Sequence, residues 1–382
     1  MVQMTVQIPD APINVAIVAN LDFFASSQGG IENYAIELVR RLNNSPVSVY
    51  CVGVLKSRRE AKPNEYIVDD KHISNYLFLL KLFFVALRLR KSNINVIHAQ
   101  RPDHLLPFIP VSKNRGMICT VHGPQQMAII KNKGKLIGMV YSFLEQIAFC
   151  FSSKVIFVDK ATAEEYISRH RMLKNKSIVL APVVSSIFFE KIPRKQALST
   201  IGLNENRKYL CFIGRLEHEK NVDLIVRAFS LVASELTDLD LIIAGEGSAR
   251  NDILKLIDEL DLKKRIIMTG MVSPEIVRNI MISSVALILA SKWEGSPLVV
   301  REALATGLPV ISTDVGDVST LINEGINGYI VKDWDENSFA TAIRKIYRWD
   351  ETHRRDNVRY NDEESWVRQI ISIYDASLRE KL

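Results

Sequence analysis

Two glutamates, Glu294 and Glu302, stand in the stretch "WEGSPLVVREALATG" with seven residues between them. Ser296 is a good N-cap residue, and Pro297 suits the first position of a helix. Glu294 is therefore expected in a loop and Glu302 inside the helix that follows. Because a helix N-terminus presents unpaired N–H groups and a positive dipole, it favours an anion such as phosphate. Both carboxylates can approach one phosphorylated ligand there.

A second group of charges follows the strand predicted over 208–213. The segment "GRLEHEKN" places Arg215 and Lys220 in a loop before the next helix. An arginine fork and a lysine point charge together hold a diphosphate well. Basic residues alone more often belong to a solvated surface loop, but a position after a strand end in an α/β domain favours phosphate binding.

Glycines and histidines follow other predicted strands. Gly29 and Gly30 precede a helix and allow close backbone approach, although adjacent glycines do not form the G-x-G-x-x-G of a dinucleotide site. His122 in "TVHG" and His98 in "IHAQ" stand at strand ends. A structural and a functional role are both open for His122, whereas a structural role is favoured for His98.

The sequence does not favour a metal site. "DWD" (333–335) looks like the D-x-D of some sugar transferases, but it is better explained as a turn in which an aspartate caps the next helix. No C-x-x-C or Cys/His spacing occurs, so the cysteines are expected to be buried reduced thiols of a cytoplasmic protein. These are Cys51, Cys119, Cys150 and Cys211.

Short Val/Ile-rich runs alternate with amphipathic segments, which is typical of parallel sheets with crossover helices. Strands are predicted over 13–19, 47–54, 95–99, 116–121, 154–158 and 177–182, and again over 208–213, 239–244, 265–269, 285–290 and 308–313. A polar segment over 187–205 interrupts the pattern and is predicted to be a linker. Two doubly wound domains follow, with the ligand expected beyond the carboxyl ends of the strands, in the gap between the domains.

Charge is distributed unevenly along the chain. Residues 1–186 carry a net charge of +10 and the rest −4, which gives the total of +6. A basic first half suits an anionic membrane surface or an anionic substrate. Nucleic acid is not expected as a partner, because the basic residues are dispersed and no recognised binding motif accompanies them.

Two apolar segments lie in this basic half. The run at 76–89 is too short to span a bilayer, and a helix packed between sheet and neighbours is favoured over one lying on a membrane. Lys131, Lys133 and Lys135 precede "LIGMVYSFLEQIAF". This segment is either a peripheral contact with anionic lipid or a polar loop before a core helix.

Residues 208–331 resemble the retaining glycosyltransferases of family four. The segments that carry the likeness are "FIGRLEHEKNVDLIVRAF", "LIIAGEGS", "TGMV" and "EGSPLVVREALATGLPVISTDVG", with the E-x7-E of the family. "GGIENYAIELVRRL", "VIHA" and "TVHG" extend it, more loosely, into the first half. The resemblance implies an α/β GT-B fold of two Rossmann-like doubly wound domains facing across a cleft. It places an acceptor-side domain at 1–186, a linker at 187–205, a donor-binding domain at 206–360, and a C-terminal helix at 361–382 that packs back on the first domain.

The resemblance also implies residue roles. Arg215 and Lys220 would clamp the donor diphosphate in place of a metal, Glu302 would bind the ribose, and Glu294 the transferred sugar. His122 would lie near that sugar and the acceptor, which makes His122, Glu294, Arg215 and Lys220 the predicted catalytic set. The predicted donor-binding set is Gly29, Gly30, Gly214, Arg215, Lys220, Gly270, Met271, Val272, Glu294, Gly295, Ser296, Pro297, Leu298, Val299 and Glu302.

The chain departs from the family pattern at several positions. Gln100 stands where a second histidine is common, Asp159 where serine is common, and "VGDVSTLI" lacks the usual second glycine and glutamate. "PVVSSIFF" (182–189) replaces the family's Asn-Gly-hydrophobic-Asp stretch. These departures concern the acceptor side and domain closure, and they leave the donor clamp intact.

The expected function is a hexosyl transfer from a UDP- or GDP-linked sugar to a hydroxyl of a glycan or lipid-linked acceptor, with retention and without a metal or other cofactor. The expected location is the cytoplasm, with a peripheral position on the inner face of the membrane left open. A nucleotide-sugar epimerase and a non-catalytic sugar-nucleotide-binding protein are the alternatives.

Overall fold

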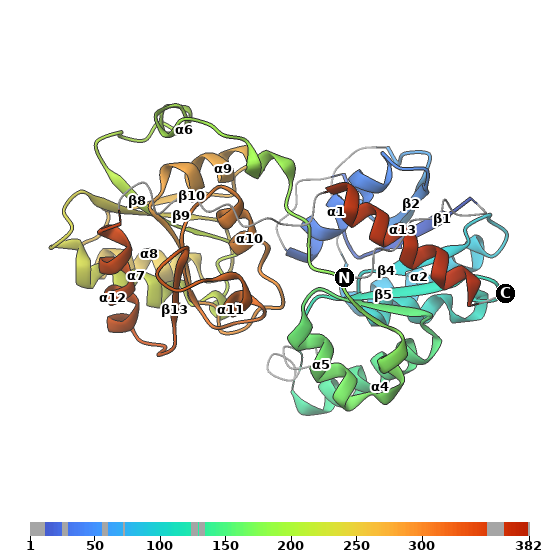
Figure 1. Cartoon of the computed structure of the whole chain (residues 1–382). Coiled ribbons are helices and arrows are strands. Elements are labelled where there is room, and N and C mark those ends of the chain that lie inside the picture. Colours follow the sequence, from blue (N-terminus) through green and yellow to red (C-terminus); the bar gives the residue numbers. More distant parts are fainter. Residues whose placement is uncertain are drawn as a thin grey trace. The chain divides into compact units, whose positions relative to one another are not determined.

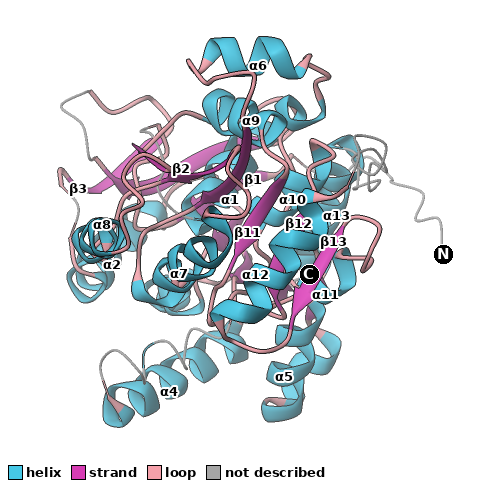
Figure 2. Cartoon of the chain, turned by 90° about the vertical axis from the view of Figure 1, so that its left-hand side faces the viewer, coloured by secondary structure: helices cyan, strands magenta, loops and turns pink. Residues whose placement is uncertain are grey.

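The computed structural model describes residues 12–24, 30–55, 60–71, 73–123, 129, 134–349 and 363–380. It divides into two compact units, one of residues 1–183 with 361–382 and one of residues 184–360. Each unit is built on a parallel sheet with helices on its faces (Figures 1 and 2).

The described strands of the first unit form a seven-stranded sheet in the order β3-β2-β1-β4-β5-β6-β7. Its elements are β1 (Asn14–Val18), α1 (Gly30–Leu42), β2 (Ser48–Val54), β3 (Glu65–Asp69), α2 (Asn75–Leu89), β4 (Val96–Ala99), the 3-10 helix η1 (Pro102–Val111), β5 (Gly116–Val121), α4 (Lys135–Phe151), β6 (Lys154–Phe157), α5 (Lys160–Arg169), the 3-10 helix η2 (Arg171–Asn175), β7 (Ser177–Val179) and α13 (Glu363–Arg379).

The two faces of this sheet have different covers. Side chains of α2, η1, α4 and α5 pack with one set of strand residues, which includes Ala16, Ile97 and Cys119. Side chains of α1 and α13 pack with the alternate set, which includes Ile17 and Ile118. This division follows from the two-residue period of a strand, and it makes the strands apolar on both faces.

The described strands of the second unit form a six-stranded sheet in the order β10-β9-β8-β11-β12-β13. Its elements are the 3-10 helix η3 (Ser186–Phe189), α6 (Arg194–Thr200), β8 (Lys208–Ile213), the 3-10 helix η4 (His218–Lys220), α7 (Val222–Ala233), β9 (Leu239–Ala244), α8 (Arg250–Glu259), β10 (Ile266–Gly270), α9 (Pro274–Ser283), β11 (Ala286–Leu289), α10 (Leu298–Ala305), β12 (Val310–Thr313), α11 (Val318–Leu321), β13 (Gly328–Val331) and α12 (Glu336–Tyr347).

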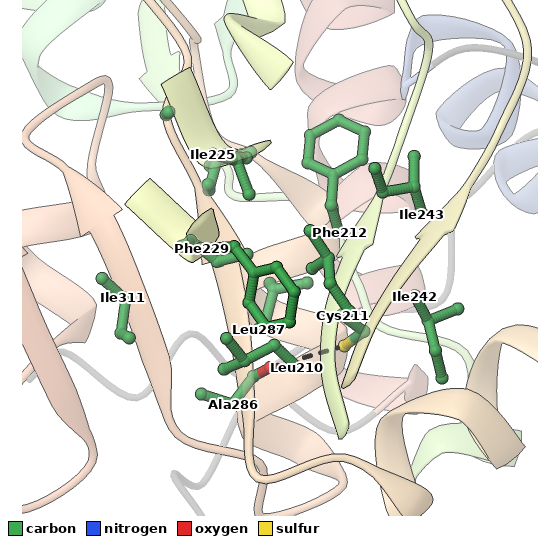
Figure 3. Packing of buried hydrophobic residues seen from close by; sticks show 14 of the residues in the cluster. Leu210, Cys211, Phe212, Ile225, Phe229, Ile242, Ile243, Ala286, Leu287 and Ile311 are labelled. Atoms are coloured by element: carbon green, nitrogen blue, oxygen red, sulfur yellow. Dashed lines mark hydrogen bonds between the residues drawn. The ribbon is translucent and has the colours of Figure 1, made fainter. Parts of the chain in front are cut away.

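The core of the second unit is made mainly of branched aliphatic and phenylalanine side chains. Figure 3 shows side chains from β8, β9, β11, β12 and α7 gathered between sheet and helix. The Cys211 thiol donates to the carbonyl oxygen of Ala286 at 3.6 Å, and burial raises the pKa of this thiol to about 12. It is therefore an inert core residue, as the sequence predicts.

Every strand that the sequence predicts is present, and two strands add to them. These are β13, which is only four residues long, and β3, whose sequence EYIVD is short, partly charged and lies at the sheet edge. The segment 187–205, predicted to be a linker, contains η3 and α6 and lies within the second unit, whose core includes Phe188 and Leu198. The prediction that all cysteines are buried was wrong for Cys150, which is exposed on α4.

Helix α13 belongs to the first unit although the second unit precedes it in the chain. Trp366 is 1% exposed and donates from its indole N–H to the carbonyl oxygen of Ala181 at 3.0 Å. The Tyr374 hydroxyl is 2.8 Å from Nδ1 of His98 on β4. Figure 1 shows α13, in red, among the blue and cyan elements of this unit.

Replacing Trp366 tests how much α13 contributes to the stability of the first unit. Trp366→Ala should destabilise the first unit by about 3–5 kcal/mol, because it leaves a cavity and an unpaired Ala181 carbonyl. Arg368→Ala, on the exposed side of the same helix, should change stability by less than about 0.5 kcal/mol. Chemical denaturation would measure both, and equal midpoints for the two variants would contradict this role of α13.

Candidate functional site

The strand order of the second unit changes direction between β8 and β11. From β8 the chain builds outward through β9 and β10, and from β11 it builds in the other direction through β12 and β13. Loops that leave the carboxyl ends of neighbouring strands at such a switch point diverge and leave a crevice for a ligand. The predicted donor-binding residues of this unit lie in these loops, at the end of β10 and in the first two turns of α10.

The loop after β8 carries the two predicted cations. Arg215 is half exposed, and its Nη2 lies 3.3 Å from Oε1 of Glu219. Lys220 ends η4, and Asn221 follows with a left-handed backbone (φ 54°) before α7 begins. Asparagine tolerates this conformation better than most residues, so it suits the sharp turn.

Lys220 forms an ion pair with Glu294, which lies in the loop after β11. Both side chains are only 16% exposed, and the Ser291 hydroxyl donates to the same Glu294 oxygen at 2.8 Å. The backbone N–H of Lys292 donates to the carbonyl oxygen of Glu219 at 2.8 Å. The two loops at the switch point are therefore joined by a side-chain ion pair and a backbone hydrogen bond.

The start of α10 differs from the sequence prediction. Pro297 precedes the helix, and Ser296 does not cap it. The Ser296 hydroxyl instead donates to Asp317 at 3.0 Å and accepts from Nε of Arg301 at 3.0 Å. Because Arg301 also forms a nearly buried ion pair with Asp317, its charge draws the serine hydroxyl away from the helix end.

Gly316 fits closely against the loop that contains Glu294. Its φ is 58°, and a Cβ atom there would lie 1.6 Å from the carbonyl oxygen of Gly295. The neighbouring N–H of Asp317 donates to that same oxygen at 3.2 Å. The backbone of the loop after β12 therefore contacts the backbone of the Glu294 loop closely, and only glycine fits at position 316.

The remaining predicted donor residues of this unit lie along the same sheet edge. The N–H of Gly245 donates to the carbonyl oxygen of Gly270 at 2.8 Å, which joins the ends of β9 and β10. Met271 is 48% exposed, whereas Val272 packs against the core. Leu298 and Val299 form the first turn of α10, and Glu302 is half-buried one turn later. Gly214 follows β8 directly.

The first unit has its own switch point, between β1 and β4. A pocket of about 230 Å³ opens there, and its lining combines apolar residues with the polar residues Asn20, Glu32, Asn75, Gln100, Arg101 and His104. Nε2 of Gln100, Nδ1 of His104 and Oδ1 of Asn20 are buried and find no hydrogen-bond partner among the described residues. Gln100 and His104 are no more than 1% exposed.

Charge in this pocket is compensated within the chain. Arg101 donates to both carboxylate oxygens of Asp103 at 3.0 Å, and Asn75 donates to Asp103 at 2.7 Å. Burial lowers the pKa of His104 to about 4, so its imidazole is neutral at neutral pH. Besides Glu32, the pocket therefore offers neutral hydrogen-bonding groups and an internally paired arginine.

His122 lies at the end of β5, within reach of this pocket's lining. Its Nε2 is 3.2 Å from Oε1 of Gln100, and its ring meets Tyr34 edge to face with centroids 4.8 Å apart. Burial, and next the charge of Arg101, lower the pKa of His122 to about 3. His98 is fully buried between Tyr374 and Thr120, with both contacts at 2.8 Å, so its role is structural as the sequence favours.

The structure thus brings Lys220 and Glu294 into contact and places the other donor residues of the second unit along one sheet edge. Gly30 and His122 belong to the first unit, and Gly29 lies outside the described residues. Asp335 caps α12 by accepting from the N–H groups of Asn337 and Ser338, at 2.9 and 3.0 Å, as expected for the "DWD" turn. Within the described ranges, no three His, Cys, Asp or Glu side chains gather as metal ligands would.

Sequence reasoning missed several residues that hold this site. Glu219, Ser291 and Arg301 were not singled out, although Glu219 stands four residues after Arg215, a common spacing for a helical ion pair. Asp317 was noted only as a departure from the family pattern. Its pairing with Arg301 could not be read from sequence separation.

Two family models match this chain in succession. The model described as "Glycosyltransferase Family 4" matches residues 28–185, and the model described as "Glycosyl transferases group 1" matches residues 194–364. The chain belongs to family four of the glycosyltransferases. It is a glycosyltransferase, and its two Rossmann-like units are those of the GT-B fold.

Individual relatives agree with this family. The chain is 26% identical to the UDP-Gal:alpha-D-GlcNAc-diphosphoundecaprenol alpha-1,3-galactosyltransferase of Escherichia coli over 263 residues, which cover 68% of this chain and 67% of the relative. The fold of this chain is similar to that of sucrose-phosphate synthase from Thermosynechococcus elongatus. The TM-score is 0.74 at 17% identity, and the match covers 97% of this chain and 94% of the synthase. This chain is also similar in fold to Anabaena HepE in complex with UDP, with a TM-score of 0.69, 15% identity, and coverage of 97% and 98%.

The contact of Gly316 with the Glu294 loop leads to a stability prediction for this glycosyltransferase. Gly316→Ala should destabilise the second unit by well over the roughly 1–2 kcal/mol that a left-handed residue costs, because its methyl group would strike the Gly295 carbonyl. Gly325→Ala is the matched control, since its φ is also positive (79°) but nothing lies within 4 Å of the added atom. Urea denaturation of both variants measures the difference. An equal loss of unfolding free energy in both variants would contradict the prediction, because it would mean that the Glu294 loop moves aside at no cost.

Proposed function

We propose that this glycosyltransferase moves a hexose from a UDP- or GDP-linked donor to a hydroxyl of a glycan or lipid-linked acceptor, with retention of configuration and without a metal. The observation that carries the proposal is the Lys220–Glu294 ion pair at the switch point of the second unit. It places a cation and a carboxylate at one crevice, where the first can meet a phosphate and the second a sugar hydroxyl.

The roles of the charged residues follow from this placement. Arg215 and Lys220 neutralise the departing diphosphate, and the first-turn N–H groups of α10 add their dipole. Glu302 accepts from the ribose hydroxyls and Glu294 from the sugar. Since Lys220 and Arg215 are each paired with a glutamate, the diphosphate competes with those carboxylates as it binds.

The remaining predicted residues complete the donor site. Gly270, Met271 and Val272 contact the base through their backbone, and Gly29 and Gly30 approach the phosphates. The names of two similar proteins support a uridine nucleotide: the Escherichia coli relative uses UDP-Gal, and the Anabaena structure contains UDP.

The acceptor is proposed to enter the first-unit pocket. Its unpartnered buried groups on Asn20, Gln100 and His104 suit a ligand rich in hydroxyls, because each would gain the hydrogen bond it lacks. His122 is uncharged at neutral pH, so it orients a hydroxyl by hydrogen bonding and does not supply positive charge. In the transfer, the bond from the anomeric carbon to the β-phosphate oxygen breaks, a bond to the acceptor oxygen forms, and the acceptor's proton leaves with the nucleoside diphosphate.

A donor screen tests this function. Thermal shifts with UDP- and GDP-sugars would identify the donor, and incubation with that donor and an acceptor extract should then yield a glycosylated product whose anomeric configuration equals that of the donor. An isomerised donor would indicate the epimerase. Binding without turnover would indicate the non-catalytic protein.

The two glutamates should respond differently to substitution. Glu302→Ala should weaken binding of both the nucleoside diphosphate and the nucleotide sugar by about 1.5–3 kcal/mol, the usual worth of a hydrogen bond to a charged group. Glu294→Ala should not weaken diphosphate affinity, because it removes the carboxylate that competes for Lys220, and it should depress turnover, because a sugar that is held loosely is misaligned for attack. Glu294→Gln is the control. It also removes the charge that pairs with Lys220, but it keeps an oxygen that accepts from Ser291. Calorimetry and a rate assay decide, and equal loss of diphosphate affinity in both alanine variants would refute the assignment.

Metal independence is tested by chelation. Activity should survive an excess of chelator, and Lys220→Ala should lower turnover by about 10²-fold or more, which corresponds to about 2.7 kcal/mol of transition-state stabilisation. Arg344→Ala, which removes a surface pair with Glu235, is the control and should keep full turnover. Complete loss in chelator that a divalent ion restores would rule out the metal-free mechanism.

A further inference from the structure

Helix α2 exposes a stripe of large apolar side chains. The sequence favours a helix packed between sheet and neighbours, and Phe78, Leu82 and Val85 do pack inward. The opposite side remains exposed, with exposed fractions of 59% for Tyr76, 39% for Leu77, 64% for Leu80, 40% for Phe83, 60% for Phe84 and 43% for Leu87. Their spacing of three and four residues keeps them on one helix face.

Helix α4 does the same in its first half. Gly138 and Tyr141 face the core, whereas Leu136, Met139, Val140 and Phe143 are 72%, 59%, 53% and 63% exposed. Of the two alternatives left open for this segment, a core helix describes only its inward side. Large apolar side chains scattered singly over a surface are normal, but a contiguous set indicates an interaction surface.

The two stripes lie in the same layer of the first unit. Both helices pack against η1, and the inward side chains of α2, η1 and α4 share one core on one face of the sheet. α4 lies at the lower margin of this unit in both views (Figures 1 and 2). The outer sides of α2 and α4 are called the apolar face below, defined by Tyr76, Leu80, Phe84, Leu136, Val140 and Phe143.

The exposed charges on α2 and α4 themselves have one sign. α2 contains no Asp or Glu, and the one carboxylate of α4, Glu145, is 1% exposed and accepts from Tyr166. Arg88, Arg90 and Lys91 are exposed at the end of α2, and Lys135 is exposed at the start of α4. Lys131 and Lys133, predicted beside them, lie outside the described residues.

We infer that this enzyme binds an anionic lipid bilayer through the apolar face of α2 and α4, with both helices lying in the membrane–water interface. Among the described residues no helix is both long and apolar enough to cross a bilayer. Apolar side chains that enter the acyl boundary and basic residues that meet lipid phosphates act together in such binding. A second copy fits less well, because a two-fold contact through this face would bring the same basic residues toward each other.

Vesicle flotation tests this inference with the full chain and no nucleotide sugar, so its result does not depend on the proposed reaction. The chain should float with vesicles of phosphatidylglycerol and phosphatidylcholine and much less with phosphatidylcholine alone. Raising the salt concentration should weaken the binding. Arg88→Gln should lower the partition coefficient about fivefold, the effect of roughly 1 kcal/mol per basic residue near anionic lipid.

Substitutions on the apolar face should weaken vesicle binding more than Arg88→Gln does. Leu80→Glu with Phe84→Glu, and separately Leu136→Glu with Phe143→Glu, should each lower vesicle binding by at least about tenfold, because a carboxylate is repelled by the surface and the lost side chain no longer enters it. Leu231→Glu with Ile326→Glu, at exposed apolar positions of the second unit, is the matched control and should bind as the unaltered chain does. Melting curves show that each variant is folded.

Three outcomes would overturn the inference: failure of the unaltered chain to float with anionic vesicles, equal binding to anionic and neutral vesicles, or full binding by both face variants. Analytical sedimentation of the chain in solution tests the other possible occupant of the face, a second copy of this chain. A dimer that the face variants abolish, without vesicle binding by the unaltered chain, would assign the face to a second copy.

Discussion

The Lys220–Glu294 ion pair joins the loops of two neighbouring strands that send their chains to opposite sides of the sheet. Each side chain alone would lie in a sparsely exposed position with an uncompensated charge, which is costly. Together they hold each other at the mouth of the switch point, and Ser291 fixes the carboxylate. Removing either partner therefore affects the position of the other.

Contacts around the start of α10 hold this arrangement in place. Arg301 and Asp317 pair beneath the start of α10, Ser296 is bound between them, and Gly316 lets the loop after β12 approach the Gly295 carbonyl. The positions of Glu294 and of the first-turn N–H groups thus depend on contacts from the loops that follow three neighbouring strands of the sheet, β8, β11 and β12. The first unit differs in character: its pocket has neutral amides, imidazoles with lowered pKa values and a compensated arginine, which suits hydroxyls better than phosphate.

Much of the fold could be predicted because its strands are apolar on both faces and its helices amphipathic, so the sequence period carries the information. The sequence also places Lys220 and Glu294 after strands whose carboxyl ends share one edge, but their ion pair was not predicted. Three features could not be found in this way. β3 has too little apolar character, the hydroxyl of Ser296 is drawn to a charge twenty-one residues away in Asp317, and the outward side of α2 is as apolar as its inward side, so pattern alone does not say which is covered.

The return of α13 to the first unit has a consequence for synthesis on the ribosome. Residues 184–349 contain every strand of the second unit, so that sheet can form as soon as they emerge. The first unit is translated earlier, yet the core on one face of its sheet stays open until Trp366, Ile370 and Tyr374 arrive. The usual order, in which the N-terminal domain folds first, is therefore reversed at the last step. During translation, the nascent chain carries a completed second unit while the part of the first unit's apolar sheet face that α13 covers is still exposed, and this is the stage at which a chaperone would bind.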